Sequence, residues 1–128
     1  MVDILILSHS KDLALGVKEL ASQMAPSIKI YAIGGTADGE IGSDAEKIIE
    51  AITNPSKDGL IVLFDLGSSM MNAQMAYEFI EENKKHLVYI ADLPLVEGAV
   101  QIAVKAQGGD CLEEIIKYCD ENKYGKLA

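Results

Sequence analysis

The sequence predicts an α/β fold, with an open, mostly parallel sheet of about four strands and helices on both faces. Short aliphatic runs alternate with longer segments in which apolar residues recur at helical spacing, and this alternation is typical of βαβ units. Glycines, prolines and capping residues separate the segments. The chain has 128 residues, of which 49 % are hydrophobic and 24 % are charged, and we expect a single domain over residues 1–128.

The first strand and the first helix are predicted between Val2 and Pro26. Val2–Leu7 is an aliphatic and β-branched run of the kind found in buried strands. Behind it, apolar residues recur at helical spacing until Pro26 ends the helix. This predicted apolar stripe consists of Leu13, Val17, Leu20 and Met24.

A second strand and a second helix follow. Ile28–Ile33 alternates apolar and polar residues, which favours a strand. A glycine-rich loop comes next, and Ser43 with Glu46 has the spacing of a capping box. The helix that this box opens should end at Pro55. Its apolar face consists of Ala45, Ile48, Ile49 and Ile52.

The third and fourth strands are predicted in the middle of the chain. Leu60–Phe64 is a continuous apolar run and predicts the third strand. After the turn that starts at Asp65, a helix is expected through about Lys84. Leu87–Ala91 predicts the fourth strand. Each strand is thus followed by a helix, as a parallel sheet requires.

Two helices complete the chain. A turn at Pro94 leads into a helix from about Val96 to Gln107, which the pair Gly108-Gly109 ends. Asp110 with Glu113 has the capping spacing for a last helix. Its apolar side consists of Leu112, Ile115, Ile116 and Cys119. The whole arrangement is of the flavodoxin-like type.

Charge, the length of apolar runs and cysteine spacing exclude several classes of protein. The formal net charge is −9, which argues against nucleic-acid binding because phosphates attract clustered Lys and Arg. The longest apolar runs, Ile4–Leu7 and Leu60–Phe64, are too short to span a bilayer, and no secretory signal is visible. Cys111 and Cys119 form no CxxC pair and are expected to be reduced thiols. These features indicate a cytoplasmic protein.

Polar residues follow the strands at the edge where parallel sheets bind ligands. The segment Ser8-His9-Ser10 lies just past the first strand, and Asp65 lies just past the third. In open α/β sheets the functional site lies beyond the carboxyl ends of the strands. We therefore expect His9 at the functional edge, with Asp65 close to it.

These residues fit phosphoryl transfer through a phosphohistidine. A largely neutral imidazole can attack phosphorus and form a covalent intermediate. Asp65 would fix the tautomer of His9 and support the positive charge that develops on its ring. The turn Gly67-Ser68-Ser69 at a helix N-terminus would offer amides to the phosphoryl oxygens, and Ser10 would offer a hydroxyl and further amides. The residues alone do not decide which imidazole nitrogen is phosphorylated.

Other roles remain open for the same residues. His9 could simply bond a nearby carbonyl, and Ser10 could be only an N-cap, although the companion residues favour the functional role of His9. Asp65 taken alone suits a helix-dipole or capping role as well as it suits catalysis. A metal site on His9 and Asp65 lacks further ligands, since His86 precedes the fourth strand at the opposite end and is assigned no function. A receiver domain needs an acidic pair after the first strand and a lysine after a fifth strand, so we reject that alternative.

In these motifs the sequence resembles the mannose-type IIA domains of the bacterial phosphoenolpyruvate phosphotransferase system. Four segments carry the resemblance over nearly the whole chain: ILSHSKDLALGVKELASQM, GEIGSDAEKIIEAI, LFDLGSSMMNAQMA and LPLVEGAVQIAVKAQGG. The second and fourth segments point to the branch that serves dihydroxyacetone kinase. The turn after the third strand lacks the longer Gly-Gly-Ser-Pro segment of the sugar transporters, which argues against sugar transport.

The resemblance implies a phosphotransferase subunit with no cofactor. His9 would take a phosphoryl group from the carrier protein HPr on Nε2, and Asp65 would orient and stabilise His9. The phosphoryl group would then pass to ADP on the nucleotide subunit DhaL, which phosphorylates dihydroxyacetone held by DhaK. Family members are typically homodimers. A sugar-transport IIA domain, or a non-catalytic flavodoxin-like module that binds a small phosphorylated ligand, is the alternative.

The helix after Ser69 should carry a partner surface. Met71 and Met75 are expected on its outer face, among glutamates. Methionine is flexible and polarizable, and it suits surfaces that fit more than one partner. Cover for a neighbouring helix or for a dimer interface is the alternative role of these two residues.

Overall fold

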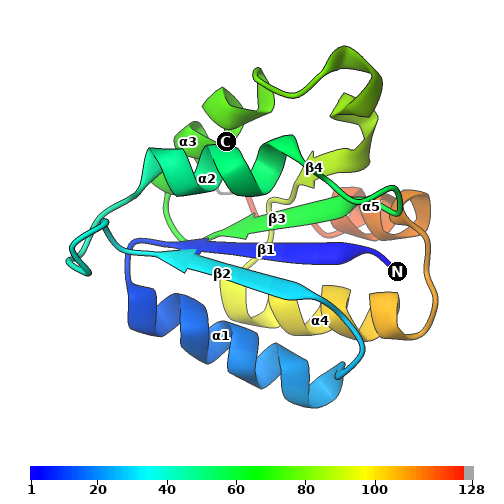
Figure 1. Ribbon diagram of the computed structural model, residues 1–128. Coiled ribbons are helices and arrows are strands. Elements are labelled where there is room, and N and C mark those ends of the chain that lie inside the picture. Colours follow the sequence, from blue (N-terminus) through cyan, green and yellow to red (C-terminus); the bar gives the residue numbers. More distant parts are fainter. Residues whose placement is uncertain (126–128) are drawn as a thin grey trace.

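The structure, a computed structural model, describes residues 1–125 and has the predicted α/β architecture (Figure 1). Its strands form one sheet in the order β2-β1-β3-β4, and all neighbouring strands are parallel. This is the predicted flavodoxin-like sheet. The strands are β1 (Asp3–Ser8), β2 (Ile30–Gly34), β3 (Leu60–Phe64) and β4 (Val88–Ile90).

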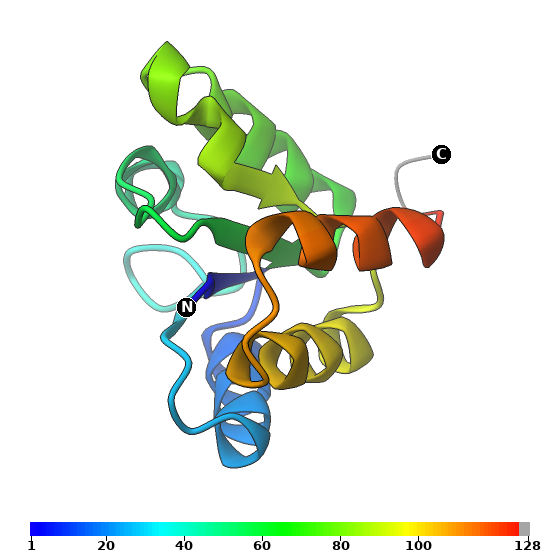
Figure 2. The same cartoon turned by 90° about the vertical axis from the view of Figure 1, so that its right-hand side faces the viewer.

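Helices cover both faces of the sheet, as predicted (Figures 1 and 2). On one face lie α1 (Lys11–Met24), α4 (Leu95–Gln107) and α5 (Leu112–Glu121), which share one buried core. On the other face lie α2 (Ala45–Thr53) and α3 (Gly67–Tyr77), which share a second core. Within residues 1–125, no helix is long and apolar enough to cross a membrane.

Burial on both faces explains why the central strands read as continuous apolar runs. In β1, Ile4 and Ile6 point into the core beneath α1 and α4, whereas Leu5 and Leu7 point into the core beneath α2 and α3. All four side chains are fully buried. A strand covered on both sides needs apolar residues at every position, so no polar alternation remains in its sequence.

The buried side of α1 differs from the predicted apolar stripe. Val17 is buried, but Leu13, Leu20 and Met24 are exposed. The residues that α1 buries beside Val17 are small, namely Ala14 and Ala21. Small side chains let α1 lie close to the sheet and to α4, whose buried positions are also rich in alanine, and the larger residues stay outside.

The third helix is shorter than predicted, because α3 ends at Tyr77 rather than near Lys84. The N–H groups of residues 78–80 donate to carbonyls three residues back instead of four. This tighter turn buries Ile80 in the core and leads into a 3₁₀ helix (Glu82–Leu87) before β4 begins.

Two predicted helix caps are displaced by one residue. The cap of α2 is Asp44 rather than Ser43, and its carboxylate accepts from the N–H of residue 47 at 3.3 Å. The N-cap of α5 is Cys111 rather than Asp110, with Glu114 completing the capping box. At α5 the next residue also has a glutamate three positions on, whereas at α2 the Asp44 side chain alone makes the cap.

Both cysteines are free thiols, as expected. Cys119 is packed in the core against the sheet, and this burial raises its pKa to about 11. Its thiol is therefore protonated and unreactive at neutral pH.

Candidate active site

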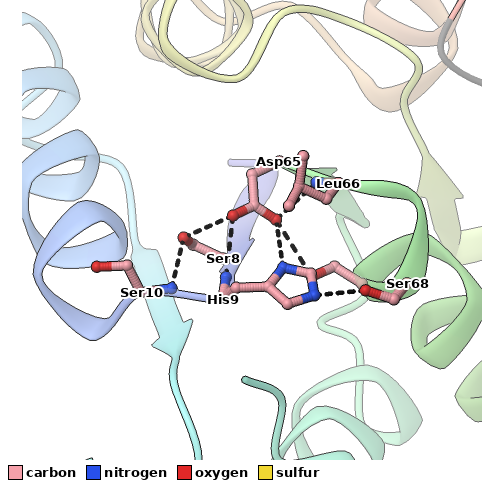
Figure 3. Close-up of polar contacts among 7 residues, drawn as sticks. Ser8, His9, Ser10, Asp65, Leu66 and Ser68 are labelled. Carbon is pink, nitrogen blue, oxygen red and sulfur yellow. Dashed lines mark hydrogen bonds and ion pairs between the residues drawn. The ribbon is translucent and has the colours of Figure 1, made fainter. Parts of the chain in front are cut away.

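His9 and Asp65 are the first residues after two neighbouring strands. The parallel register of β1 and β3 pairs Leu7 with Phe64, so the two side chains meet at the carboxyl edge of the sheet. Nδ1 of His9 lies 3.1 Å from Oδ1 of Asp65 (Figure 3). The His9 and Asp65 side chains are 18 % and 13 % exposed, so water screens their interaction only in part.

Asp65 accepts hydrogen bonds on both carboxylate oxygens. Oδ2 accepts from the hydroxyl of Ser8 at 2.8 Å and from the backbone N–H of His9 at 2.9 Å. Oδ1 accepts from the backbone N–H of Leu66 at 2.7 Å and from the hydroxyl of Ser69 at 3.3 Å. Burial by itself would raise the pKa of Asp65, but the hydrogen bonds outweigh burial and hold the pKa below its usual value. The carboxylate is therefore ionised at neutral pH.

The surroundings of the imidazole distinguish its two nitrogens. Nδ1 faces Oδ1 of Asp65 and lies 3.2 Å from the hydroxyl of Ser69. Because an ionised carboxylate can only accept, Nδ1 carries the proton of the neutral ring. Nε2 then holds the lone pair and contacts the hydroxyl of Ser68, which can donate to it. The nitrogen of His9 that is available to attack an electrophile is Nε2.

The N-terminus of α3 lies beside this nitrogen. The N-cap residue of α3 is Leu66, and no side chain caps the helix. The first N–H groups of a helix have no partner within it, so those of Gly67 and Ser68 suit an anion. The N–H of Ser69 instead donates to the carbonyl of Leu66 at 3.1 Å. The predicted phosphate-binding turn thus adjoins His9, with its first two amides the better placed to receive an anion.

Ser10 lies further from the imidazole than the other predicted residues. Its hydroxyl caps α1 by accepting from the N–H of Leu13 at 3.2 Å, and its side chain points away from the ring (Figure 3). The second histidine, His86, lies in the 3₁₀ helix before β4, as expected for a residue outside the site. Among residues 1–125, no three His, Cys, Asp or Glu side chains gather in a way that could hold a metal ion.

Sequence reasoning missed the contribution of Ser8. This residue ends β1, and its buried hydroxyl lies between the carboxylate of Asp65 and the backbone N–H of Ser10, from which it accepts at 3.0 Å. The only signal in the sequence was a polar residue in the last buried position before His9.

The loop between β2 and α2 supports His9 from the backbone side. The N–H of Gly42 donates to the carbonyl of His9 at 2.9 Å. At Gly34, the end of β2 and the turn into α1 lie so close that an added Cβ would be 2.4 Å from the carbonyl oxygen of Ser10. Glycine is required there by this close approach of two backbones.

An exposed apolar surface extends from the site along α3. Met71 and Met75 are 64 % and 56 % exposed, so they lie on the outer face as predicted. Leu66, the N-cap residue of α3, and Phe79, just beyond the helix, are also 59 % and 65 % exposed. We call Leu66, Met71, Met75 and Phe79 the α3 stripe. These exposed apolar side chains are the candidates for a docking surface beside the site.

Known proteins resemble the chain over most of its length. The family model for EIIA-man, described as the PTS system fructose IIA component, matches residues 3–116. A Lactococcus lactis protein, the phosphotransferase subunit DhaM of a PTS-dependent dihydroxyacetone kinase, is 36 % identical, and the match covers 88 % of each chain. A Listeria innocua phosphoryl donor subunit DhaM of a PEP-dependent dihydroxyacetone kinase is also 36 % identical, over 81 % of each chain.

Two further comparisons bear on length and fold. The phosphoryl donor subunit DhaM of Providencia stuartii is 40 % identical over 91 % of this chain, but the chain spans only 25 % of that relative. A crystal structure of a protein described as of unknown function superposes with a TM-score of 0.82 at 39 % identity, covering 92 % of both chains.

Proposed function

The chain belongs to the mannose-type IIA family of the phosphotransferase system, and we propose that it is the phosphoryl-donor subunit of a dihydroxyacetone kinase. In this proposal His9 accepts a phosphoryl group from phospho-HPr and passes it to ADP on the DhaL subunit, which serves DhaK. Full-length relatives with names of this kind support the assignment. The observation that carries it is the contact of Nδ1 of His9 with Asp65, which leaves the Nε2 lone pair beside the N-terminus of α3.

In the first step, the Nε2 lone pair of His9 attacks the phosphorus of the donor phosphohistidine. The donor P–N bond breaks, and its electron pair returns to the donor ring. Because Nδ1 keeps its proton, the His9 ring becomes positively charged, and the ionised Asp65 carboxylate at 3.1 Å stabilises that charge. The hydroxyl of Ser68 moves off Nε2, and the amides of Gly67 and Ser68 receive phosphoryl oxygens.

In the second step, a terminal phosphate oxygen of ADP attacks the phosphorus on His9. The bond between Nε2 and phosphorus breaks, and its electron pair returns to the imidazole as ATP forms. Asp65 holds the same tautomer before and after both steps, so the ring needs no rearrangement between accepting and donating.

Phosphorylation of the purified chain tests this proposal. With enzyme I, HPr and phosphoenolpyruvate, the chain should gain one phosphoryl group by mass spectrometry, and acid should remove it, as expected for a phosphoramidate. His9→Ala should abolish the gain, and His86→Ala is the matched control that should keep it. A His9→Ala protein that still acquires the group would overturn the assignment.

A second assay tests the acceptor. The phosphorylated chain is mixed with DhaL loaded with ADP, and ATP on DhaL is measured. Formation of ATP in proportion to the loss of phosphohistidine is the expected result. A phosphorylated chain that leaves DhaL-bound ADP unchanged would exclude the dihydroxyacetone branch while leaving phosphoryl acceptance intact.

The α3 stripe is the proposed docking surface for these protein partners. Phosphoryl transfer requires a partner to cover Nε2 of His9, and the stripe begins at Leu66, directly after Asp65. Exposed methionines at Met71 and Met75 adapt to more than one partner surface. Alternatively, the stripe forms the interface of the expected homodimer. Analytical sedimentation of a variant in the stripe distinguishes partner docking from self-association. Loss of the dimer would assign the stripe to self-association.

A further inference from the structure

We propose that Ser8 is a positioning residue for phosphoryl transfer, whose buried hydroxyl fixes the Asp65 carboxylate in the orientation that serves His9. This inference rests on the proposed function. Ser8 ends β1 and is 4 % exposed. Its hydroxyl has one proton to donate and lone pairs to accept, and the structure supplies a partner for each.

The direction of both hydrogen bonds follows from the chemistry of the partners. The backbone N–H of Ser10 can only donate, so it donates to Oγ of Ser8 at 3.0 Å. The ionised carboxylate of Asp65 can only accept, so Oγ of Ser8 donates to its Oδ2 at 2.8 Å. The two bonds form a short chain from the start of α1 to the carboxylate, and each bond polarises the next.

This chain leaves the other carboxylate oxygen for the imidazole. Oδ2 of Asp65 is held by Ser8 and by the backbone N–H of His9, both on its inner side. Oδ1 therefore faces Nδ1 of His9, and the remaining donors to Oδ1 come from the start of α3. Without the Ser8 hydroxyl, Oδ2 keeps the N–H of His9 as its single donor, and the carboxylate is held less firmly in the orientation that faces the ring.

A serine that only closed the end of the strand would act differently. It would contribute to folding stability, and its loss would leave the rate of phosphoryl transfer unchanged. A positioning serine changes that rate together with the titration of Asp65, since its bond is one of those that hold the Asp65 pKa below its usual value. Among residues 1–125, His9 is the titratable side chain in direct contact with Asp65, so the pH titration of the Asp65 carboxyl has a single ionising neighbour to account for.

The test compares Ser8→Ala with Ser8→Thr, which keeps a hydroxyl. Ser56→Ala is the matched control, because Ser56 lies at the opposite end of the sheet, where its hydroxyl donates to the carbonyl of Gly59 at 3.5 Å. Two quantities are measured in each protein, the rate of phosphorylation by phospho-HPr and the pH at which the Asp65 carboxyl titrates, followed by carbon NMR without any donor present.

Ser8→Ala should phosphorylate about 10- to 100-fold more slowly, the range expected for one lost hydrogen bond to a charged group. Its Asp65 carboxyl should titrate at higher pH, and Ser8→Thr should recover both values toward the native ones. Ser56→Ala should change neither. A Ser8→Ala protein with the native rate, or with a slow rate but native Asp65 titration, would overturn the proposal. If the native chain takes no phosphoryl group, the proposed function is wrong. The NMR titration, which needs no donor, still tests whether Ser8 lowers the Asp65 pKa.

Discussion

Replacing Asp65 by asparagine removes the negative charge beside His9 while keeping the shape of the side chain. The carboxylate accepts from the backbone N–H of His9 on one oxygen and from the backbone N–H of Leu66 on the other. In Asp65→Asn one of these N–H groups must face the amide NH₂, whichever way the amide turns. That unmade hydrogen bond should lower the free energy of unfolding by about 1–3 kcal/mol.

The larger effect is on the charged ring. At the observed 3.1 Å, a unit charge on His9 and a carboxylate interact by about 5 kcal/mol at an effective dielectric constant of about 20. Because both side chains retain some exposure, we discount this to about 3–4 kcal/mol. The loss of this stabilisation in the transition state corresponds to a rate about 10²- to 10³-fold slower.

Quenched-flow measurement of phosphorylation by phospho-HPr gives this rate, and chemical denaturation gives the stability. Asp3→Asn is the matched control, since Asp3 begins β1 at the far end of the sheet and should leave the rate unchanged. A rate within about threefold of the native value in a folded Asp65→Asn protein would refute the reasoning, because threefold corresponds to only about 0.7 kcal/mol. Asp65 would then be a structural residue at the start of α3.

Three further outcomes are expected. The Asp65 pKa lies below its usual 3.8 in the folded chain, so its ionised form stabilises the fold above that pH; the stability advantage over Asp65→Asn should shrink as pH falls through the folded pKa, as measured by denaturation at several pH values. Gly34→Ala should destabilise by about 3 kcal/mol through its backbone clash, whereas Gly16→Ala, with nothing within 4 Å, should stabilise α1 by up to about 1 kcal/mol in thermal unfolding. Met71→Glu should raise the KM for phospho-HPr or for DhaL at unchanged stability. Met24→Glu, on the similarly exposed Met24 of α1, should leave both KM values unchanged. A Met71→Glu protein with native KM values would remove the α3 stripe from the mechanism.

The order of elements could be predicted because burial on both sides leaves a plain pattern. A strand such as Leu60–Phe64 has no polar position to obscure it, and the structure gives it the same bounds. Helix α1 was harder, because hydrophobicity alone ranked Leu13 and Leu20 above alanine as core residues. The core beneath α1 instead selects small side chains, a preference that depends on how closely α4 approaches, and no local pattern records that distance.

The predicted helix ends were wrong for a related reason. The turn after Tyr77 is set by burial of Ile80 in a core built from distant segments, and periodicity in the helix itself does not reveal it. For Ser43 and Asp44, two adjacent capping residues have nearly equal intrinsic preference, so small differences in tertiary packing decide between them.

The candidate site could be predicted as far as topology reaches. The rule on strand ends brings His9 and Asp65 to one edge, and the register of β1 with β3 sets them 3.1 Å apart. The role of Ser8 was not predicted, because it depends on the direction in which one hydroxyl points at the end of a strand. A sequence records that a serine is present, whereas its partner, Oδ2 of Asp65, belongs to another strand.

The start of α3 shows how stability and function make opposite demands on one position. Helices α1 and α2 have side-chain caps from Ser10 and Asp44, whereas the N-cap residue of α3 is Leu66, whose side chain has no oxygen to offer. A serine or aspartate at that position would stabilise the helix by about 1 kcal/mol, but its oxygen would occupy amides beside Nε2 of His9. In the proposed mechanism those amides receive the phosphoryl oxygens and must therefore be free. On a chain with a net charge of −9, such local donors would favour the phosphoryl group of the proposed mechanism, and the exposed leucine would add apolar surface for the proposed donor protein.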